Sequence, residues 1–264
     1  MTPRGVRSLS LQQCRELLET ADTAALPALL RSLAGDRRAG VREAVAVARN
    51  RLRAREAEAA RLEGLAALEE ELRRGGYAVV AGIDEVGRGA LAGPLTAGAV
   101  VLPAGLRIEG LDDSKRLTPE CREHIAAAVR ERCHACAVAH VDPGEIDAKG
   151  MSWAVREAMR RALDSIGCPV DHVVVDGLGV GLGIPETAVV GGDAKVAAIA
   201  AASVVAKVTR DALMVAHAAD HREYLFEENK GYGTPEHLAA IAVHGLCPLH
   251  RRSFHPCEGT PPLF

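Results

Sequence analysis

Four acidic residues follow or end short apolar runs, and they have the clearest potential for chemistry in the sequence. A buried strand that leads into an acid delivers a carboxylate to the rim of a sheet, where acids from separate strands can meet. Because clustered carboxylates repel one another, they normally hold a cation, and oxygen ligands favour Mg²⁺ or Mn²⁺. Two such ions can activate water and stabilise the leaving oxygen of a phosphodiester. The acids are Asp84 and Glu85 after YAVVAGI, Asp176 ending HVVVD, and Asp193 after AVVGG.

Some of these acids also have an ordinary structural interpretation. Asp193 could cap the Ala-rich helix that follows it, and Asp176 could form a turn with Gly177. Asp84 and Glu85 are harder to explain in this way, because acidic side chains are rarely placed side by side after a buried strand. The residues alone therefore point to metal chemistry at Asp84 and Glu85, and leave both interpretations open for the other two.

Apolar runs and helical patterns alternate in the part of the chain that carries these acids. Runs of four to eight apolar residues are typical of strands, and apolar residues three or four apart are typical of helices. The alternation predicts an α/β fold. The expected strands are 77–83, 95–102, 135–141, 172–175 and 187–190, and the expected helices are 119–132, 152–166, 194–216 and 235–243.

The first 74 residues differ in composition from the rest. They contain 14 arginines, no lysine and 11 acids, whereas the remainder has 18 basic and 24 acidic residues. Their Ala, Leu, Arg and Glu content favours helices. We therefore expect a helical N-terminal extension, 1–74, and an α/β domain with C-terminal helices, 75–264. The expected helices of the extension are Ser10–Leu18, Thr23–Leu33 and 41–74, with breaks at Gly35, Gly40 and Gly75–Gly76.

Four arginines of the long N-terminal helix share one face, because their spacings are 4, 7 and 4 residues. They are Arg38, Arg42, Arg49 and Arg53. One interpretation is a solvated helix surface, the usual fate of surface charge. The other is a stripe that contacts phosphates, because guanidinium groups match phosphate oxygens. Both interpretations stay open.

The composition excludes several classes of protein. The chain has 264 residues, 48% hydrophobic and 25% charged, which is typical of a globular protein rather than a disordered one. It has no long uncharged apolar run and no apolar signal core at its start, so we expect no membrane span and a cytoplasmic protein. The seven scattered cysteines fit free thiols. The 3% of aromatic residues argue against a broad base-stacking platform, although Tyr224, Phe226 and Tyr232 lie close together in the sequence.

The residues around the first acid pair resemble a known signature. The stretch AGIDEVGRGALAGP, 81–94, is similar to that of the ribonuclease HII family (type 2 ribonuclease H). Together the similar stretches cover about residues 70–254, in the order found in the family. The others are DDSKRLTPE at 112–120, VVVDG at 173–177, GDAKVAAIAAASVVAKVTRD at 192–211, NKGYGTPEH at 229–237 and HRRSF at 250–254.

The resemblance implies a ribonuclease H-like fold with a mixed central sheet flanked by helices. It implies a metal site at Asp84, Glu85, Asp176 and Asp193, and two-metal hydrolysis dependent on Mg²⁺ or Mn²⁺. The implied substrates are RNA–DNA hybrids and duplex DNA with embedded ribonucleotides, cut 5′ of a single ribonucleotide to leave a 3′-hydroxyl and a 5′-phosphate. We expect the enzyme to act as a monomer.

A second group of residues is expected to bind substrate. Two glycines flanking Arg88 let the backbone approach a sugar and read its 2′-hydroxyl, while the arginine forks onto phosphate. By resemblance, Tyr232 stacks on the sugar beside the ribonucleotide and Lys115 belongs to a substrate-contacting loop. The full expected set is Gly87, Arg88, Gly89, Lys115, Tyr232 and, for phosphate contact, Lys207.

The sequence departs from the family pattern in two places. Gly191 stands where a lysine usually precedes the glycine of the last acidic motif, and Ala90 stands where proline is common. The first change removes a positive charge near the acids but no ligand. Two alternatives remain: a ribonuclease HIII, which usually lacks the GRG stretch and has a β-rich N-terminal platform, and a catalytically silent hybrid-binding protein.

Overall fold

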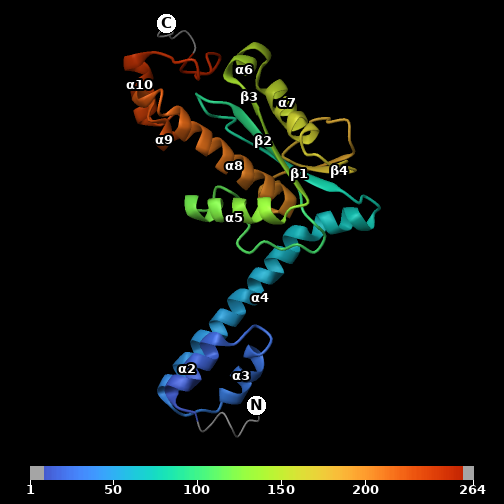
Figure 1. Ribbon diagram of the computed structural model, residues 1–264, viewed down its shortest axis with the longest axis vertical. Coiled ribbons are helices and arrows are strands. Elements are labelled where there is room, and N and C mark those ends of the chain that lie inside the picture. Colours follow the sequence, from blue (N-terminus) through green and yellow to red (C-terminus); the bar gives the residue numbers. More distant parts are fainter. Residues whose placement is uncertain (1–8, 258–264) are drawn as a thin grey trace. The chain divides into compact units, whose positions relative to one another are not determined.

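The computed structural model describes residues 9–257, and the chain divides into two compact units, Met1–Arg61 and Leu62–Phe264 (Figure 1). The first unit contains α2 (Leu11–Thr20), α3 (Leu26–Leu33) and the start of α4 (Ala39–Arg74). Ser10 caps α2 in a reciprocal pair with Gln13, which confirms the expected helix start. The helices enclose an apolar core of Cys14, Leu18, Leu26, Leu30, Leu33, Val41, Val45, Ala48 and Leu52.

Two expectations for this unit are wrong. The helix expected from Thr23 begins at Leu26, because proline in its first turn suits a helix start and Asp22 accepts the amide of Ala25 at 2.7 Å. Gly40 does not break the chain but lies inside α4. A Cβ at Gly40 would come within 2.8 Å of Leu11 Cδ2, so glycine allows close contact between helices here.

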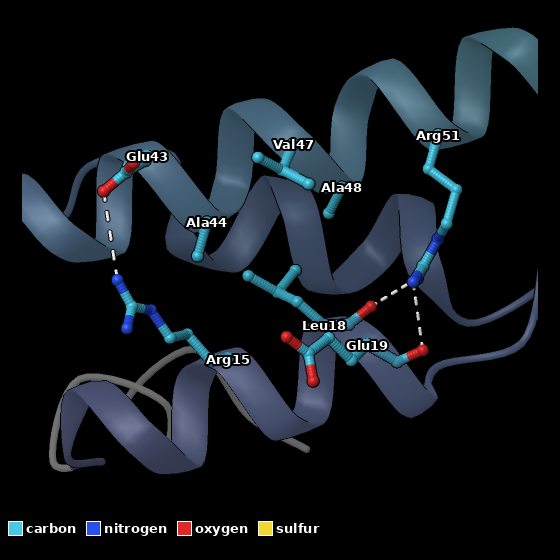
Figure 2. Close-up of a pocket in the computed structure, with 8 residues that line it drawn as sticks. All are labelled: Arg15, Leu18, Glu19, Glu43, Ala44, Val47, Ala48 and Arg51. Atoms are coloured by element: carbon cyan, nitrogen blue, oxygen red, sulfur yellow. Dashed lines mark hydrogen bonds and ion pairs between the residues drawn. The ribbon is translucent and has the colours of Figure 1, made fainter.

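A pocket of about 160 Å³ lies between α2 and α4 in the first unit (Figure 2). Arg51 closes one end by donating to the carbonyls of Leu18 and Glu19, and Arg15 pairs with Glu43 at 3.9 Å. The Arg51 bonds fasten the C-terminal end of α2 to the long helix, and the Arg15–Glu43 pair adds a contact nearer its middle. The pocket contains none of the residues expected to act in catalysis.

The second unit is built on a five-stranded mixed sheet in the order β3-β2-β1-β4-β5. The β1–β2 and β2–β3 pairs are antiparallel, whereas β1–β4 and β4–β5 are parallel. This confirms the α/β fold with a mixed central sheet. The strands are β1 (Val80–Val86), β2 (Leu95–Val101), β3 (Ala135–Val141), β4 (His172–Asp176) and β5 (Glu186–Val189).

Helices cover both faces of this sheet (Figure 1). One face packs against α8 (Ala197–His217), α5 (Pro119–Arg132) and the end of α4, and the other against α7 (Met151–Asp164). A Cβ at Gly82 would lie 2.1 Å from the Ala198 carbonyl carbon, so the Ala-rich α8 can pack closely only against a bare backbone. The remaining helices are α6 (Pro143–Lys149), α9 (Phe226–Asn229) and α10 (Pro235–His244), with short 3₁₀ turns η1 (Gly192–Ala194) and η2 (Arg222–Tyr224).

Two element boundaries differ from the expectation in a way that matters for the site. The strand expected to end at Ile83 continues to Val86, because pairing with β2 extends to Val86 while pairing with β4 stops at Ile83. Asp84 therefore lies inside a strand. The helix expected from Ala194 begins at Ala197, after the turn η1 that carries Asp193.

Two of the three clustered aromatics belong to the core. Tyr224 and Phe226 are fully buried, and their rings stack with centroids 5.5 Å apart. They therefore cannot contact substrate, and Tyr232 is the member of the cluster that is partly exposed. Within residues 9–257, no helix is long and apolar enough to cross a membrane.

Candidate active site

The four acids come from three elements that meet at one edge of the sheet. Ile83 of β1 pairs with Val175 of β4, so the next residues, Asp84 and Asp176, are neighbours on parallel strands. The Gly192 amide donates to Asp176 Oδ1 at 2.6 Å. That bond holds the turn with Asp193 against the end of β4.

Burial and like charge raise the proton affinity of this group. Burial, followed by the charges of Glu85 and Asp176, raises the pKa of Asp84 to about 8, although a hydrogen bond from Ser203 opposes the shift. Burial and Asp176 likewise raise the pKa of Glu85. Mutual repulsion of carboxylates is the electrostatic signature of a site that a cation would stabilise.

The loop that carries Lys115 reaches this group. The Lys115 ammonium donates to Asp193 Oδ2 at 2.9 Å, and this bond, followed by the charges of Asp193, Asp113 and Asp84, raises the pKa of Lys115. Behind it, the hydroxyls of Ser114 and Ser203 bond at 3.0 Å and fasten the loop to α8. The lysine side chain is still 77% exposed, so it can also approach an anionic substrate.

No three His, Cys, Asp or Glu side chains in residues 9–257 form a ready-made metal-ligand cluster. Asp193 is paired with Lys115, and one oxygen of Asp176 is occupied by the Gly192 amide. The donor set nevertheless fits a hard divalent cation, because it offers only carboxylate oxygens and two of its members, Asp84 and Glu85, have pKa values raised first by burial and then by neighbouring acids. A cation bound here would have to compete with Lys115 for Asp193.

The glycines of the GRG stretch have different roles. Gly87 has a φ of +88°, and a Cβ there would lie 2.2 Å from Arg210 Nε, so packing alone explains this glycine. A Cβ at Gly89 would meet no atom within 4 Å. Nothing in the fold requires Gly89, and its open side leaves room for a ligand. Arg88 is exposed and lies 3.7 Å from Glu85.

Two buried arginines organise the loops around the acids, and the sequence did not single out either for this role. Arg210 donates to the carbonyls of Pro94, Ala92 and Lys230 at 2.9–3.0 Å. Arg251 donates to the carbonyls of Gly93 and Arg88. Together they join residues 87–94, which we call the GRG loop, to the segments on either side of α10. The only signals in the sequence are that Arg210 lies in a largely apolar helix and Arg251 in the HRRSF string.

Tyr232 and Lys207 lie together in a second group. Lys207 Nζ is 5.4 Å from the centroid of the Tyr232 ring, and Arg210 Cζ is also 5.4 Å from it. Lys207 pairs with Asp211 at 2.9 Å. Arg210 therefore links this group to the GRG loop. Of the expected substrate residues, Arg88 and Lys115 contact the acids directly, whereas Tyr232 and Lys207 contact each other.

A buried glutamate supports the helix next to the acids. Glu69 is only 1% exposed, and its Oε2 accepts the amide of Ala198 in the first turn of α8 at 3.3 Å. A carboxylate at a helix N-terminus is favoured by the helix dipole. Burial outweighs the opposing charges of Arg73 and Arg107 and raises the pKa of Glu69 to about 7. The sequence gave no sign of this contact, which joins residues 129 apart.

Glu69 makes the stability of the second unit depend on pH. Because its pKa in the folded state is above its ordinary value, the stability that Glu69 contributes is fully present below about pH 4.5 and is lost as the pH rises to about 7. We expect Glu69→Gln, whose amide oxygen still accepts the Ala198 amide, to remove roughly 3 kcal/mol of this decline. Urea unfolding of both proteins between pH 4.5 and 8 measures the difference.

Glu70→Gln is the matched control for this experiment. Arg107 lowers the pKa of Glu70, so the charge of this glutamate stabilises the fold above its ordinary pKa and its loss acts in the opposite direction. Equal pH profiles for the wild type and Glu69→Gln would contradict the role given to Glu69.

Comparison with known proteins identifies the family. The sequence model of the family Ribonuclease HII matches residues 81–257, and that of the Ribonuclease HII N-terminal domain matches residues 10–73. A ribonuclease HII of Moorella thermoacetica is 50% identical over 204 residues, 77% of this chain and 99% of the relative. One from Desulfitobacterium hafniense strain DCB-2 is 40% identical over 254 residues, 96% of this chain and 98% of the relative.

Solved structures of similar ribonucleases also match this chain. The ribonuclease H2 of Pyrococcus horikoshii matches with a TM-score of 0.57 and 28% identity, over 68% of this chain and 95% of that one. The ribonuclease HII of Archaeoglobus fulgidus, solved with PCNA, has the same TM-score at 25% identity, over 67% and 95%. A ribonuclease HIII matches at 19% identity and a TM-score of 0.52, a likeness of fold. The chain therefore belongs to the ribonuclease HII family, and is a metal-dependent nuclease with ribonuclease H activity on RNA–DNA hybrids.

Proposed function

We propose that the protein also cuts duplex DNA 5′ of a single embedded ribonucleotide, leaving a 3′-hydroxyl and a 5′-phosphate. The observation that carries the proposal is the position of the GRG loop beside the acids: Arg88 lies 3.7 Å from Glu85, and Gly89 presents an open backbone next to it. A bare backbone beside the reactive groups can test one sugar for its 2′-hydroxyl. A site that recognises the 2′-hydroxyl of one sugar does not need several consecutive ribonucleotides in its substrate.

We assign metal binding to Asp84, Glu85, Asp176 and Asp193. Mg²⁺ or Mn²⁺ held by these carboxylates would supply the chemistry that activates water and stabilises the leaving oxygen. Lys115, which pairs with Asp193, and Arg88, which pairs with Glu85, provide positive charge for the phosphate at the cut.

The second group positions the neighbouring nucleotide. The ring of Tyr232 lies close to the charges of Lys207 and Arg210 and is partly exposed, which suits contact with a sugar. Lys207 reaches a phosphate by giving up its pairing with Asp211. We further propose that the enzyme acts as a monomer, which sedimentation at working concentration tests.

The substrate test uses three labelled duplexes: all DNA, DNA with one ribonucleotide, and an RNA–DNA hybrid. We expect no cleavage of the first, one cut 5′ of the ribonucleotide in the second, and cleavage of the third. Chelation by EDTA stops both reactions, and added Mg²⁺ or Mn²⁺ restores them. Cleavage of the hybrid alone contradicts single-ribonucleotide recognition, and binding of the hybrid without cleavage contradicts the enzyme altogether.

The first unit carries the arginine stripe, which we propose contacts duplex phosphates. Residues 1–61 contain 12 arginines and 7 acidic residues, so this unit is positively charged. Of the four arginines in the stripe, Arg42, Arg49 and Arg53 are exposed and available to contact phosphates. Arg38 is engaged locally, because its guanidinium donates to Asp36 at 2.6 Å and to the Leu9 carbonyl at 2.7 Å.

We expect replacing the three stripe arginines by alanine to weaken hybrid binding and to reduce the slope of log Kd against log salt by about 2–3. Titrations at several salt concentrations measure this slope. An unchanged slope contradicts the phosphate contact. The control removes the same charge outside the stripe, at Arg31, Arg37 and Arg55. Deleting the whole unit is a coarser test and must stop at Arg61, because Leu62, Leu65 and Glu69 are buried in the second unit.

A further inference from the structure

Two buried histidines lie beneath the loop that carries Tyr232, and none of the chemistry above uses them. His237 on α10 is fully buried, and His250, which forms an isolated bridge with Ala92, is 2% exposed. Their Nε2 atoms are 3.1 Å apart. Two ring nitrogens at this distance bond only if one carries a proton and the other does not.

The surrounding atoms assign each proton. The backbone amide of Cys247 is 3.1 Å from His250 Nδ1, and an amide can only donate, so this nitrogen accepts and the proton of His250 is on Nε2. The Tyr232 carbonyl is 2.9 Å from His237 Nδ1, and a carbonyl can only accept, so His237 is protonated on Nδ1. The bond between the rings therefore runs from His250 Nε2–H to His237 Nε2.

The environment keeps both rings neutral. Burial, and then the proximity of His237, lowers the pKa of His250 to about 4, and burial lowers the pKa of His237. The rings of Tyr224 and Phe226 pack against both histidines. The Cys247 thiol, whose pKa burial raises to about 11, stays protonated and lies 3.2 Å from His250 Nδ1.

The result is a directed chain of hydrogen bonds that ends on Tyr232. The Tyr232 carbonyl also accepts the amide of Thr234 at 2.8 Å, so two donors fix this peptide. The next residue after His250 is Arg251, which holds the carbonyls of Arg88 and Gly93. The pair therefore connects the loop of Tyr232 to the segment that holds the GRG loop.

We propose that His237 and His250 are a positioning pair that sets the Tyr232 loop relative to the GRG loop, so that ring and backbone contact adjacent nucleotides of the same strand. The inference rests on the proposed role of Tyr232. It acts through the direction of the hydrogen bonds: His237 must donate from Nδ1, and His250 must donate from Nε2.

The first test reads the tautomers of the wild-type protein directly. Long-range ¹H–¹⁵N correlation of the histidine side chains at pH 7 is expected to find His237 in the Nδ1–H form and His250 in the Nε2–H form, both neutral. The opposite tautomer at either residue, or a cation, overturns the proposal. This measurement requires no variant and so does not depend on a substitution folding.

The second test separates positioning from simple packing. The amide of His237→Asn can occupy the Nδ1 position and donate to Tyr232, whereas that of His237→Gln reaches the Nε2 position and cannot. We expect His237→Gln to lower kcat for hybrid cleavage about 10- to 100-fold with little change in KM, and His237→Asn, which keeps the donation to the Tyr232 carbonyl but loses the bond with His250, to lower it only about 3- to 10-fold. Equal losses in the two variants overturn the proposal.

A double-mutant cycle with Tyr232→Ala completes the design. If His237 acts through Tyr232, His237→Gln causes no further loss in the Tyr232→Ala background; additive losses overturn the inference. If Tyr232→Ala alone leaves cleavage unchanged, the proposed substrate contact of Tyr232 fails and the inference fails with it. If Tyr232→Ala lowers activity and His237→Gln does not, the inference alone fails.

Discussion

Asp84→Asn is expected to slow cleavage of RNA–DNA hybrids by about 10³-fold or more while the protein still folds and binds the hybrid. Metal-ion catalysis contributes several kcal/mol of transition-state stabilisation, and each 1.4 kcal/mol is a factor of ten in rate. Asparagine keeps the shape of the side chain but removes its charge from the centre of the acidic group. Single-turnover cleavage in Mg²⁺ and in Mn²⁺, with hybrid binding measured in EDTA, checks both parts.

The same substitution is expected to leave the metal-free fold at least as stable as the wild type. Asp84 is 5% exposed, and its pKa of about 8 reflects burial and repulsion by Glu85 and Asp176, which a neutral amide relieves. The matched control is Asp164→Asn, the same change at an exposed carboxylate at the end of α7. Wild-type cleavage by Asp84→Asn, or a loss of activity that accompanies unfolding, would count against the metal-binding role.

Arg210→Met is expected to destabilise the second unit by about 3–5 kcal/mol and to reduce cleavage at the same time. Methionine fills a similar volume but leaves the carbonyls of Ala92, Pro94 and Lys230 without their donor in a buried place. Urea unfolding monitored by circular dichroism measures the stability. The substitution also removes the hydrogen bonds by which Arg210 connects the GRG loop to the loop of Tyr232. Activity is therefore expected to fall even under conditions where the variant is fully folded.

Arg210→Lys is expected to recover little of this loss, because an ammonium group cannot reproduce the planar fork that serves three carbonyls. The control is Arg160→Met on α7, whose half-exposed side chain pairs with Glu157 and Asp164. Its effect is expected to be within about 1 kcal/mol. A loss at Arg210 no larger than that at Arg160 would contradict the role of Arg210 in holding the loops.

Local sequence signals predicted most elements of the second unit well. The strand 135–141 and the helix 119–132 have the expected bounds, because proline and threonine mark the helix start and a short apolar run marks the strand. The errors arose where tertiary contacts override local preference. Pairing with β2 extends β1 beyond Ile83, and Gly40 lies inside α4, where the absence of a side chain lets Leu11 approach closely.

The candidate site divides in the same way. The identities of Asp84, Glu85, Asp176 and Asp193 followed from the sequence, because acids after apolar runs and a family signature are both local features of the chain. Of the two glycines in GRG, only the structure separates Gly87, which packing requires, from Gly89, which it does not. Both positions are simply glycine in the sequence, but in the structure Arg210 lies against Gly87 and no atom lies close to the open side of Gly89.

By itself the sequence determined the family resemblance, the alternating α/β elements and the four acids, since these depend on residue type and short spacing. Only the tertiary structure revealed the groups that hold the site together: Lys115 on Asp193, Glu69 under α8, Arg210 and Arg251 on loop carbonyls, and His237 with His250. Each of these depends on burial or on the direction of a hydrogen bond. The burial of a side chain and the direction of its hydrogen bonds are set by residues distant in the sequence, so they are defined only once the chain has folded.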